Sequence, residues 1–254
     1  MKKSFILPLV AAVTFSYSSV SLAEALNPSL SQNQQDKLEK IEAVLVDNPD
    51  LIDGLLTSLN LYLDQQNRQS EMMAKYQDWI YNNPQNTSMG KADAALTIVN
   101  ITDFNCPYCK KLDPVLEQLV KEMPDDVRVV NIYVPLKQQD VKGLGTTSAE
   151  FALNVWQQDR DAFEQVNQLL VKRPQMHDKN SLTRIAKHTG TENSLTRQDD
   201  TRAMIDKNYQ MFTDLGLRGT PAMLMGTEVI PGYMPIEQLR PIVKAQIAQQ
   251  QSQS

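Results

Sequence analysis

Two patterns of hydrophobic positions divide the chain. Over residues 30–83, apolar side chains recur every three or four positions, the period of an amphipathic helix. Pro49 suits the first turn of a second helix in this region, because the missing N–H costs nothing there. The apolar stripe of that second helix is formed by Ile52, Leu56, Leu59 and Leu63. We therefore expect a helical region over 24–83 and, from its Asn and Pro content, a linker over 84–91.

Beyond the linker the pattern becomes that of alternating strands and helices. Residues 95–99 and 127–134 are β-branched apolar runs of strand length, and the segment between them has one apolar helical face. Strand, helix and strand in this order imply parallel pairing through a right-handed crossover. The remaining expected elements are helices over about 146–217, short strands at 222–225 and 228–230, a last helix, and a fraying tail at 249–254. This order predicts an α/β thioredoxin fold over 92–248 with an inserted helical subdomain.

The N-terminus has the features of a secretory signal. Lys2 and Lys3 precede an apolar run that ends near Phe15, and Ser21-Leu22-Ala23 supplies small residues for cleavage. The run is shorter than the roughly 20 residues that span a bilayer. We expect a signal peptide over 1–23, cleaved near Ala23, and weigh an uncleaved membrane anchor as the alternative.

Charge and cysteine content narrow the chemistry. The chain has 25 basic and 30 acidic residues, a net charge of −5, and no basic run, which argues against nucleic-acid binding. Its two cysteines are Cys106 and Cys109, whose bridge would close a very short loop and stabilise the fold little. Zinc ligation would need two more ligands, and His177 and His188 are distant in sequence and expected at the surface. Redox chemistry is therefore favoured over a metal site or an inert bridge.

A cysteine pair at the start of a helix suits thiol–disulfide exchange. Unpaired backbone N–H groups and the helix dipole stabilise a thiolate at Cys106, and Pro107 fits the first helical position. We expect Cys106 to be exposed and to act as the nucleophile. Cys109, one turn later and more buried, is expected to resolve the mixed disulfide.

Several short motifs together resemble the DsbA family of periplasmic oxidoreductases. The resemblance covers about 92–248 and includes Pro114 in the active-site helix and the cis-proline loop Gly219-Thr220-Pro221. The N-terminal helices are similar to those of oligomeric relatives of the suppressor-of-copper-sensitivity protein C type. The active-site motif that carries the likeness is Asp103-Phe104-Asn105-Cys106-Pro107-Tyr108-Cys109-Lys110.

The resemblance implies roles for residues around the cysteines. Pro221 would be cis and Thr220 would hydrogen-bond an extended substrate, beside Pro107 and Tyr108. Relatives usually carry an acid at the position of Asn100. An amide cannot take up a proton, so a relay here would use water or another carboxylate. Asp103 is a candidate, with a turn-forming role at the end of the strand as the alternative. Strong oxidants carry histidine where this chain has Tyr108, so we predict a potential below the roughly −120 mV of DsbA.

The resemblance also implies location and partners. We expect a periplasmic protein without a cofactor other than the Cys106–Cys109 disulfide, acting on exported thiol proteins with a membrane redox partner of DsbD or DsbB type. The apolar stripe of 24–83 predicts a homo-oligomer, dimer or trimer, with docking on its own domain as the alternative. Isomerase or reductase activity is favoured. A DsbA-type oxidase is the first alternative, and a periplasmic chaperone or copper-buffering thiol protein is the alternative of another class.

Overall fold

A computed structural model describes residues 30–137, 140–226 and 228–251. The predicted signal peptide and the last three residues of the predicted tail lie outside these ranges. No helix within the described ranges is long and apolar enough to cross a membrane. The chain separates after Leu61 into two compact units.

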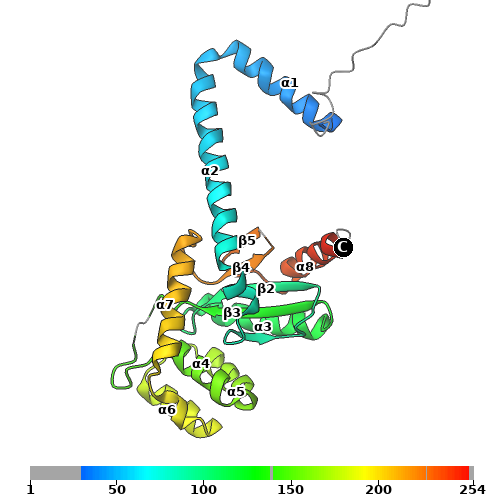
Figure 1. Ribbon diagram of the computed structural model, residues 1–254. Helices are drawn as coiled ribbons and strands as arrows, with labels where there is room; N and C mark the ends of the chain where they lie inside the picture. Colours follow the sequence, from blue (N-terminus) through cyan, green and yellow to red (C-terminus); the bar gives the residue numbers. More distant parts are fainter. Residues whose placement is uncertain (1–29, 138–139, 227, 252–254) are drawn as a thin grey trace, which may run out of the picture. The chain divides into compact units, whose positions relative to one another are not determined.

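The described part of the first unit, residues 30–61, is helical. Helix α1 spans Gln32–Asp47, a short 3-10 turn spans Pro49–Leu51, and α2 begins at Ile52 and continues to Gln77 in the second unit (Figure 1). The turn starts with Pro49, where the sequence predicts the second helix to start. Helix α1 has no buried residue, and none of residues 30–61 is buried, so this part of the unit has no core of its own.

The second unit is built on a five-stranded sheet with strand order β1-β3-β2-β4-β5. As predicted, β2 and β3 pair in parallel, and the other three pairings are antiparallel. Strand β1 falls within the segment that the sequence predicts to be a linker, because three residues are too few to show a period. The strands are β1 Thr87–Met89, β2 Leu96–Thr102, β3 Val127–Tyr133, β4 Ala222–Met225 and β5 Glu228–Pro231.

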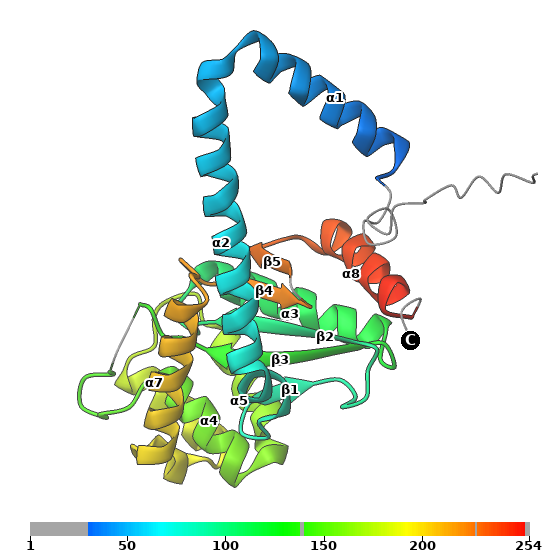
Figure 2. The same ribbon diagram turned by 45° about the horizontal axis from the view of Figure 1, so that its top comes forward.

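Helices cover both faces of this sheet (Figure 2). On one face, α3 (Pro107–Glu122) and α8 (Ile236–Gln251) bury their leucines against β2 and β3. On the other face lie α7 (Asp199–Asp214) and the end of α2 with its π-helical turn at Asp78–Asn82. The Tyr76 hydroxyl donates a hydrogen bond to Asp214 over 2.6 Å, and Tyr76 and Ile80 are both buried. The end of α2 is therefore part of the core of the second unit.

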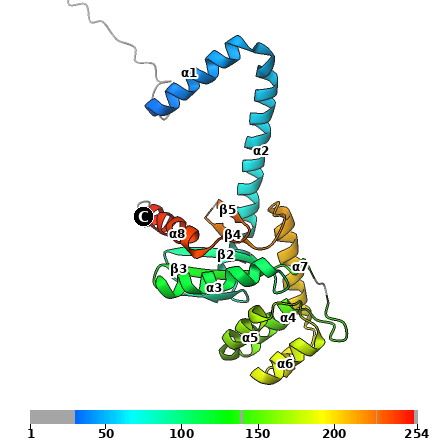
Figure 3. The same cartoon turned by 180° about the vertical axis from the view of Figure 1, so that it is seen from behind.

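Between β3 and β4 the chain forms a helical subdomain, seen together in Figures 1 and 3. Its core contains Phe151, Val166 and Leu182 and reaches the sheet through Phe104 and Tyr133, whose rings stack 4.9 Å apart. These elements confirm the predicted thioredoxin fold with an inserted helical subdomain and a preceding helical extension. The subdomain comprises α4 Ser148–Gln158, α5 Arg160–Lys172, α6 Lys179–Thr189 and a 3-10 turn at Glu192–Leu195, followed by α7.

Candidate functional site

The two cysteines lie where β2 passes into α3. Cys106 is the N-cap residue of α3 and Pro107 its first residue. The preceding turn is fixed by Asp103, whose Oδ1 accepts a hydrogen bond from the Asn105 backbone N–H over 2.8 Å. The second oxygen of Asp103 accepts one from the backbone N–H of Lys137 over 3.1 Å. These bonds fasten the turn to the loop after β3 and so position the Cys106 sulfur.

Cys106 is covered rather than exposed. Only 4% of it is accessible, so the prediction that Cys106 is exposed is wrong, while its role as the nucleophile stays a prediction. The reason is tertiary: its Sγ lies 3.2 Å from the Thr220 carbonyl oxygen, in the loop that precedes β4. A hydrogen bond from the Cys109 side chain lowers the pKa of Cys106 to about 5, helped by the Cys109 and Tyr108 backbone N–H groups and by the Thr220 side chain, against the effect of burial.

Cys109 has the opposite electrostatic environment. It is 3% exposed, and burial, together with the neighbouring Cys106, raises the pKa of its thiol. Both cysteines are free thiols in this structure. At neutral pH the pair therefore carries one thiolate, at Cys106, and one proton, at Cys109.

The residues predicted to contact substrate differ in how exposed they are. The Thr220–Pro221 peptide bond is cis, as the resemblance implied. Pro221 is buried, Thr220 half-buried and Pro107 exposed. Tyr108 is 58% exposed, with the Lys111 ammonium 5.4 Å from the centre of its ring. An exposed aromatic beside a reactive sulfur suits contact with a polypeptide.

The helical subdomain is hydrogen-bonded to the turn before α3, a contact that the sequence did not predict. Asn105 Oδ1 accepts a hydrogen bond from the His177 backbone N–H over 2.8 Å. The His177 ring is buried, with Nε2 2.9 Å from the Leu170 carbonyl oxygen, so the prediction of a surface histidine is wrong. Burial lowers the pKa of His177 to about 4. His188 is exposed, as predicted. The hydrogen bond between Asn105 and His177 depends on how the subdomain packs on the sheet, so it could not be predicted from the local sequence.

The two candidate relay residues are both buried, but neither is a free base. Asn100 donates a hydrogen bond through Nδ2 to Asn131 Oδ1 on β3 over 2.9 Å, and its amide has no titratable proton. Burial raises the pKa of Asp103, whose two oxygens already accept backbone hydrogen bonds. A third buried polar group, Asp113 on α3, was missed by sequence reasoning, although its spacing from Cys109 was readable. Among the described residues there is no group of three or more His, Cys, Asp and Glu side chains that could hold a metal.

Comparisons with known proteins agree with this arrangement. The family model described as Thioredoxin matches residues 82–245. A linker-deletion variant of ScsC from Proteus mirabilis is 31% identical, with a TM-score of 0.67 over 88% of this chain and 99% of that one. A periplasmic thioredoxin-like protein from Salmonella enterica serovar Typhimurium is 32% identical, with a TM-score of 0.62 over 68% of this chain and 95% of that one. Disulfide bond formation protein D of Bacillus subtilis is 22% identical over 173 residues, covering 63% of this chain and 76% of that protein.

Proposed function

This chain belongs to the ScsC-like part of the DsbA family of thioredoxin-fold thiol–disulfide oxidoreductases, and we propose that it acts in the periplasm as a disulfide isomerase or reductase within a homo-oligomer. The observation that carries the proposal is the placement of two neighbouring cysteines at the start of α3, with Cys106 at its N-cap and Cys109 buried in its first turn. Cys106 holds a thiolate of pKa about 5, whereas burial keeps the proton on Cys109.

This arrangement supports a two-stage reaction. The Cys106 thiolate attacks a substrate disulfide, forming a mixed disulfide and releasing one substrate thiolate. In isomerisation that thiolate attacks another disulfide of the same substrate, and a substrate thiolate finally displaces Cys106. In reduction the Cys109 thiolate attacks Cys106, so that the enzyme becomes the disulfide and the substrate gains both electrons.

The side chain between the cysteines favours isomerase or reductase over primary oxidase. The surroundings of Cys106 lower the pKa of its thiol to about 5, so the thiolate is stabilised to some degree at neutral pH. A less stabilised thiolate makes a weaker oxidant, and Tyr108 adds no charge to stabilise it. We therefore expect a potential between roughly −120 and −270 mV, the range that includes disulfide isomerases. The periplasmic location rests on the predicted signal peptide and on the Salmonella relative, which is itself described as periplasmic.

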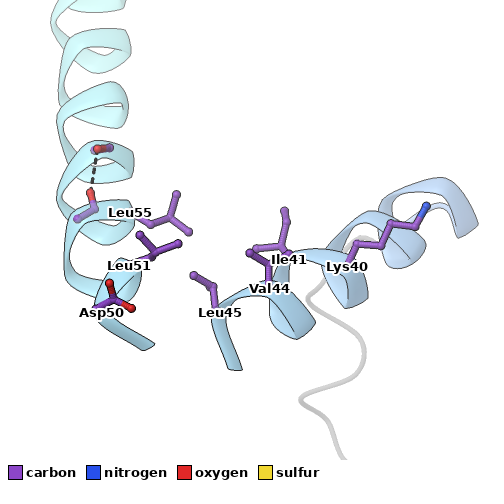
Figure 4. Close-up of a pocket in the computed structure, with 9 residues that line it drawn as sticks. Lys40, Ile41, Val44, Leu45, Asp50, Leu51 and Leu55 are labelled. Carbon is purple, nitrogen blue, oxygen red and sulfur yellow. Dashed lines mark hydrogen bonds between the residues drawn. The ribbon is translucent and has the colours of Figure 1, made fainter. Parts of the chain in front are cut away.

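The first unit supports the oligomer. Its apolar side chains are about half exposed, and Ile41, Val44 and Leu45 of α1 face the same space as Leu51 and Leu55 (Figure 4). They line a cavity of about 590 Å³. Contiguous exposed apolar surfaces are uncommon on monomeric proteins and usually mark an interaction site. A second copy of the same helices offers a matching apolar surface, which is why we propose self-association.

One pair of measurements tests the proposed activity. The potential of the Cys106–Cys109 couple is measured by equilibration with glutathione, and isomerase activity by reactivation of scrambled ribonuclease. We expect a potential clearly below roughly −120 mV together with reactivation. A potential at or above that value without reactivation would identify an oxidase instead.

A further inference from the structure

Resolution of a mixed disulfide by Cys109 requires a proton acceptor. The attacking species is a thiolate, and burial holds Cys109 in its thiol form. Asn100 cannot accept a proton, and Asp103 already receives two backbone hydrogen bonds. A carboxyl group whose oxygens are not engaged in holding this turn, and which lies near a sulfur that is 3% exposed, would be better placed to accept the proton.

Asp113 lies on the same face of α3 as Cys109. The two residues are four positions apart in one helix, which places their Cβ atoms roughly 5–6 Å apart. Asp113 is 6% exposed, so its carboxyl group faces the interior, as the Cys109 thiol does. Its Oδ2 accepts a hydrogen bond from Asn167 Nδ2 on α5 over 3.2 Å.

A cavity on the far side of Asn167 leads outward. It has a volume of about 270 Å³, well above the roughly 30 Å³ that one water molecule occupies. Asn167 is buried, and its Oδ1 has no hydrogen-bond partner among the described residues, so it is free to bind water in the cavity. Exposed charged residues, among them Lys121 and Glu164, also line the cavity and place it in contact with solvent.

A second buried polar chain reaches the same cavity from beneath the active site. Asn100 bonds Asn131, whose Nδ2 lies 3.4 Å from Thr87 Oγ1, and Thr87 is 2.9 Å from the Tyr133 hydroxyl. Asn131 lines the cavity beside Asn167. Burial and the nearby Asp113 raise the pKa of Tyr133, so the phenol keeps its proton and cannot serve as the base. Asp113, which is buried, is the carboxyl group that raises the pKa of Tyr133.

We propose that Asp113 accepts the proton of Cys109 when Cys109 attacks the mixed disulfide, and that water in the adjoining cavity returns this proton to solvent while Asn167 holds the carboxyl group in place. The proposal rests on the proposed exchange activity. The Cys109 proton moves to the Asp113 carboxylate, and a bond forms between the Cys109 and Cys106 sulfurs. The bond between Cys106 and the substrate sulfur breaks, and the substrate leaves as a thiolate. In the reverse direction the Asp113 carboxylic acid returns the proton to Cys109 as the enzyme disulfide opens.

The electrostatics of Asp113 suit this role. Burial, together with the charge of Glu117 on the same helix, raises the pKa of Asp113 to about 7, while the hydrogen bond from Asn167 opposes the shift. The charge of Asp113 interacts with Glu117 on α3 and with Tyr133 on β3, and Cys109 lies one turn earlier on the same buried face of α3. A base with a pKa near the working pH both accepts and releases a proton readily.

The reaction with the aromatic disulfide DTNB separates the two steps within one experiment. Attack by Cys106 releases one thionitrobenzoate and leaves a mixed disulfide, and attack by Cys109 releases the second. Stopped-flow traces are recorded from pH 5 to 9 for the full mature chain and for Asp113→Asn, with Cys109→Ser identifying the second phase by its loss. Thermal unfolding checks that Asp113→Asn, a nearly isosteric change, remains folded.

In the unchanged protein we expect the second phase to accelerate with an inflection near pH 7. In Asp113→Asn that inflection should vanish and the second phase at pH 7 should slow by at least about tenfold, with the first phase unchanged. Asp161→Asn, an exposed carboxyl on α5, is the matched control and should match the unchanged protein. Asn167→Leu should slow the second phase as well, since it removes the link to the cavity.

The outcomes distinguish this proposal from the proposed function. If the unchanged protein showed no first phase, the exchange activity itself would be refuted. A normal first phase with an unaltered second phase in Asp113→Asn would refute only the role of Asp113. If Asp103→Asn, and not Asp113→Asn, abolished the inflection of the second phase, the role of Asp113 would also be refuted.

Discussion

The sulfur of Cys106 lies 3.2 Å from the carbonyl oxygen of Thr220, a residue 114 positions later in the chain. The first belongs to the N-terminus of α3 and the second to the loop before β4. The helix terminus favours a thiolate, whereas the carbonyl oxygen can accept a hydrogen bond only from a thiol. The protonation state of Cys106 is therefore coupled to two segments that meet only in the folded protein.

Alkylation kinetics should report the lowered pKa of Cys106. The rate of reaction with iodoacetamide should rise with an inflection near pH 5. Cys109→Ala should move the inflection upward, because the hydrogen bond from Cys109 is the largest cause of the lowered pKa. Cys106→Ser supplies the background rate. An inflection near 8.5, that of a free peptide thiol, would contradict the proposed chemistry.

The residue between the cysteines should tune the reduction potential. Tyr108→His places a titratable cation beside the thiolate, stabilises the reduced form and should make the potential less negative by tens of millivolts. Tyr108→Phe, which adds no charge, should shift it much less. Both are measured by glutathione equilibration, and equal shifts for the two variants would exclude an effect of charge.

Asp113 should make the protein less stable as pH rises. Its ordinary pKa of 3.8 applies to the unfolded chain, whereas the folded state keeps the proton up to a pKa of about 7. Between these values the folded state binds more protons, so the free energy of unfolding falls with pH. Asp113→Asn removes this loss and should be more stable than the unchanged protein above pH 7 by a few kcal/mol, but not at pH 4. Urea unfolding of the reduced protein at the two pH values measures the difference.

His177 should have the opposite pH dependence. The pKa of His177 is about 4 in the folded protein and 6.5 in the unfolded chain. The unfolded state therefore binds more protons between these values, and stability rises with pH over that interval. His177→Gln should lose this slope, so that the decline caused by Asp113 becomes visible in urea titrations from pH 4 to 6.5. A slope that still rises in this variant would show that His177 is not the group responsible.

Charge placed on the apolar face of the first unit should dissociate the oligomer. Leu55→Glu and Leu59→Glu put carboxylates at about half-exposed positions of α2, where burial against another copy would be costly. We expect light scattering to show monomers, and reactivation of scrambled ribonuclease to fall while DTNB reactivity persists.

The matched control for these variants is Asn60→Glu, an exposed polar position on the same helix. Deletion of residues 24–83 is a poorer test, because it also removes Tyr76 and Ile80, which are buried in the core of the second unit. An unchanged mass for Leu55→Glu would argue that the stripe is covered in another way.

The sequence by itself determined the elements that depend on local chemistry. The parallel pairing of β2 and β3 followed from two β-branched runs joined by a helix. The placement of Cys106 at a helix start followed from Pro107 and the apolar face beyond it. Strand β1 was missed because three residues carry no period.

Tertiary structure alone decided what surrounds the cysteines. Three contacts near the cysteines join residues at least 54 positions apart. They are the contact of the Cys106 sulfur with the Thr220 carbonyl oxygen, the hydrogen bond between Asn105 and His177, and the hydrogen bond between Asp113 and Asn167. Their effects are desolvation and hydrogen bonding, which depend on distances across the fold and leave no pattern in the local sequence. The same long-range packing covered Cys106, which local rules had placed at the surface.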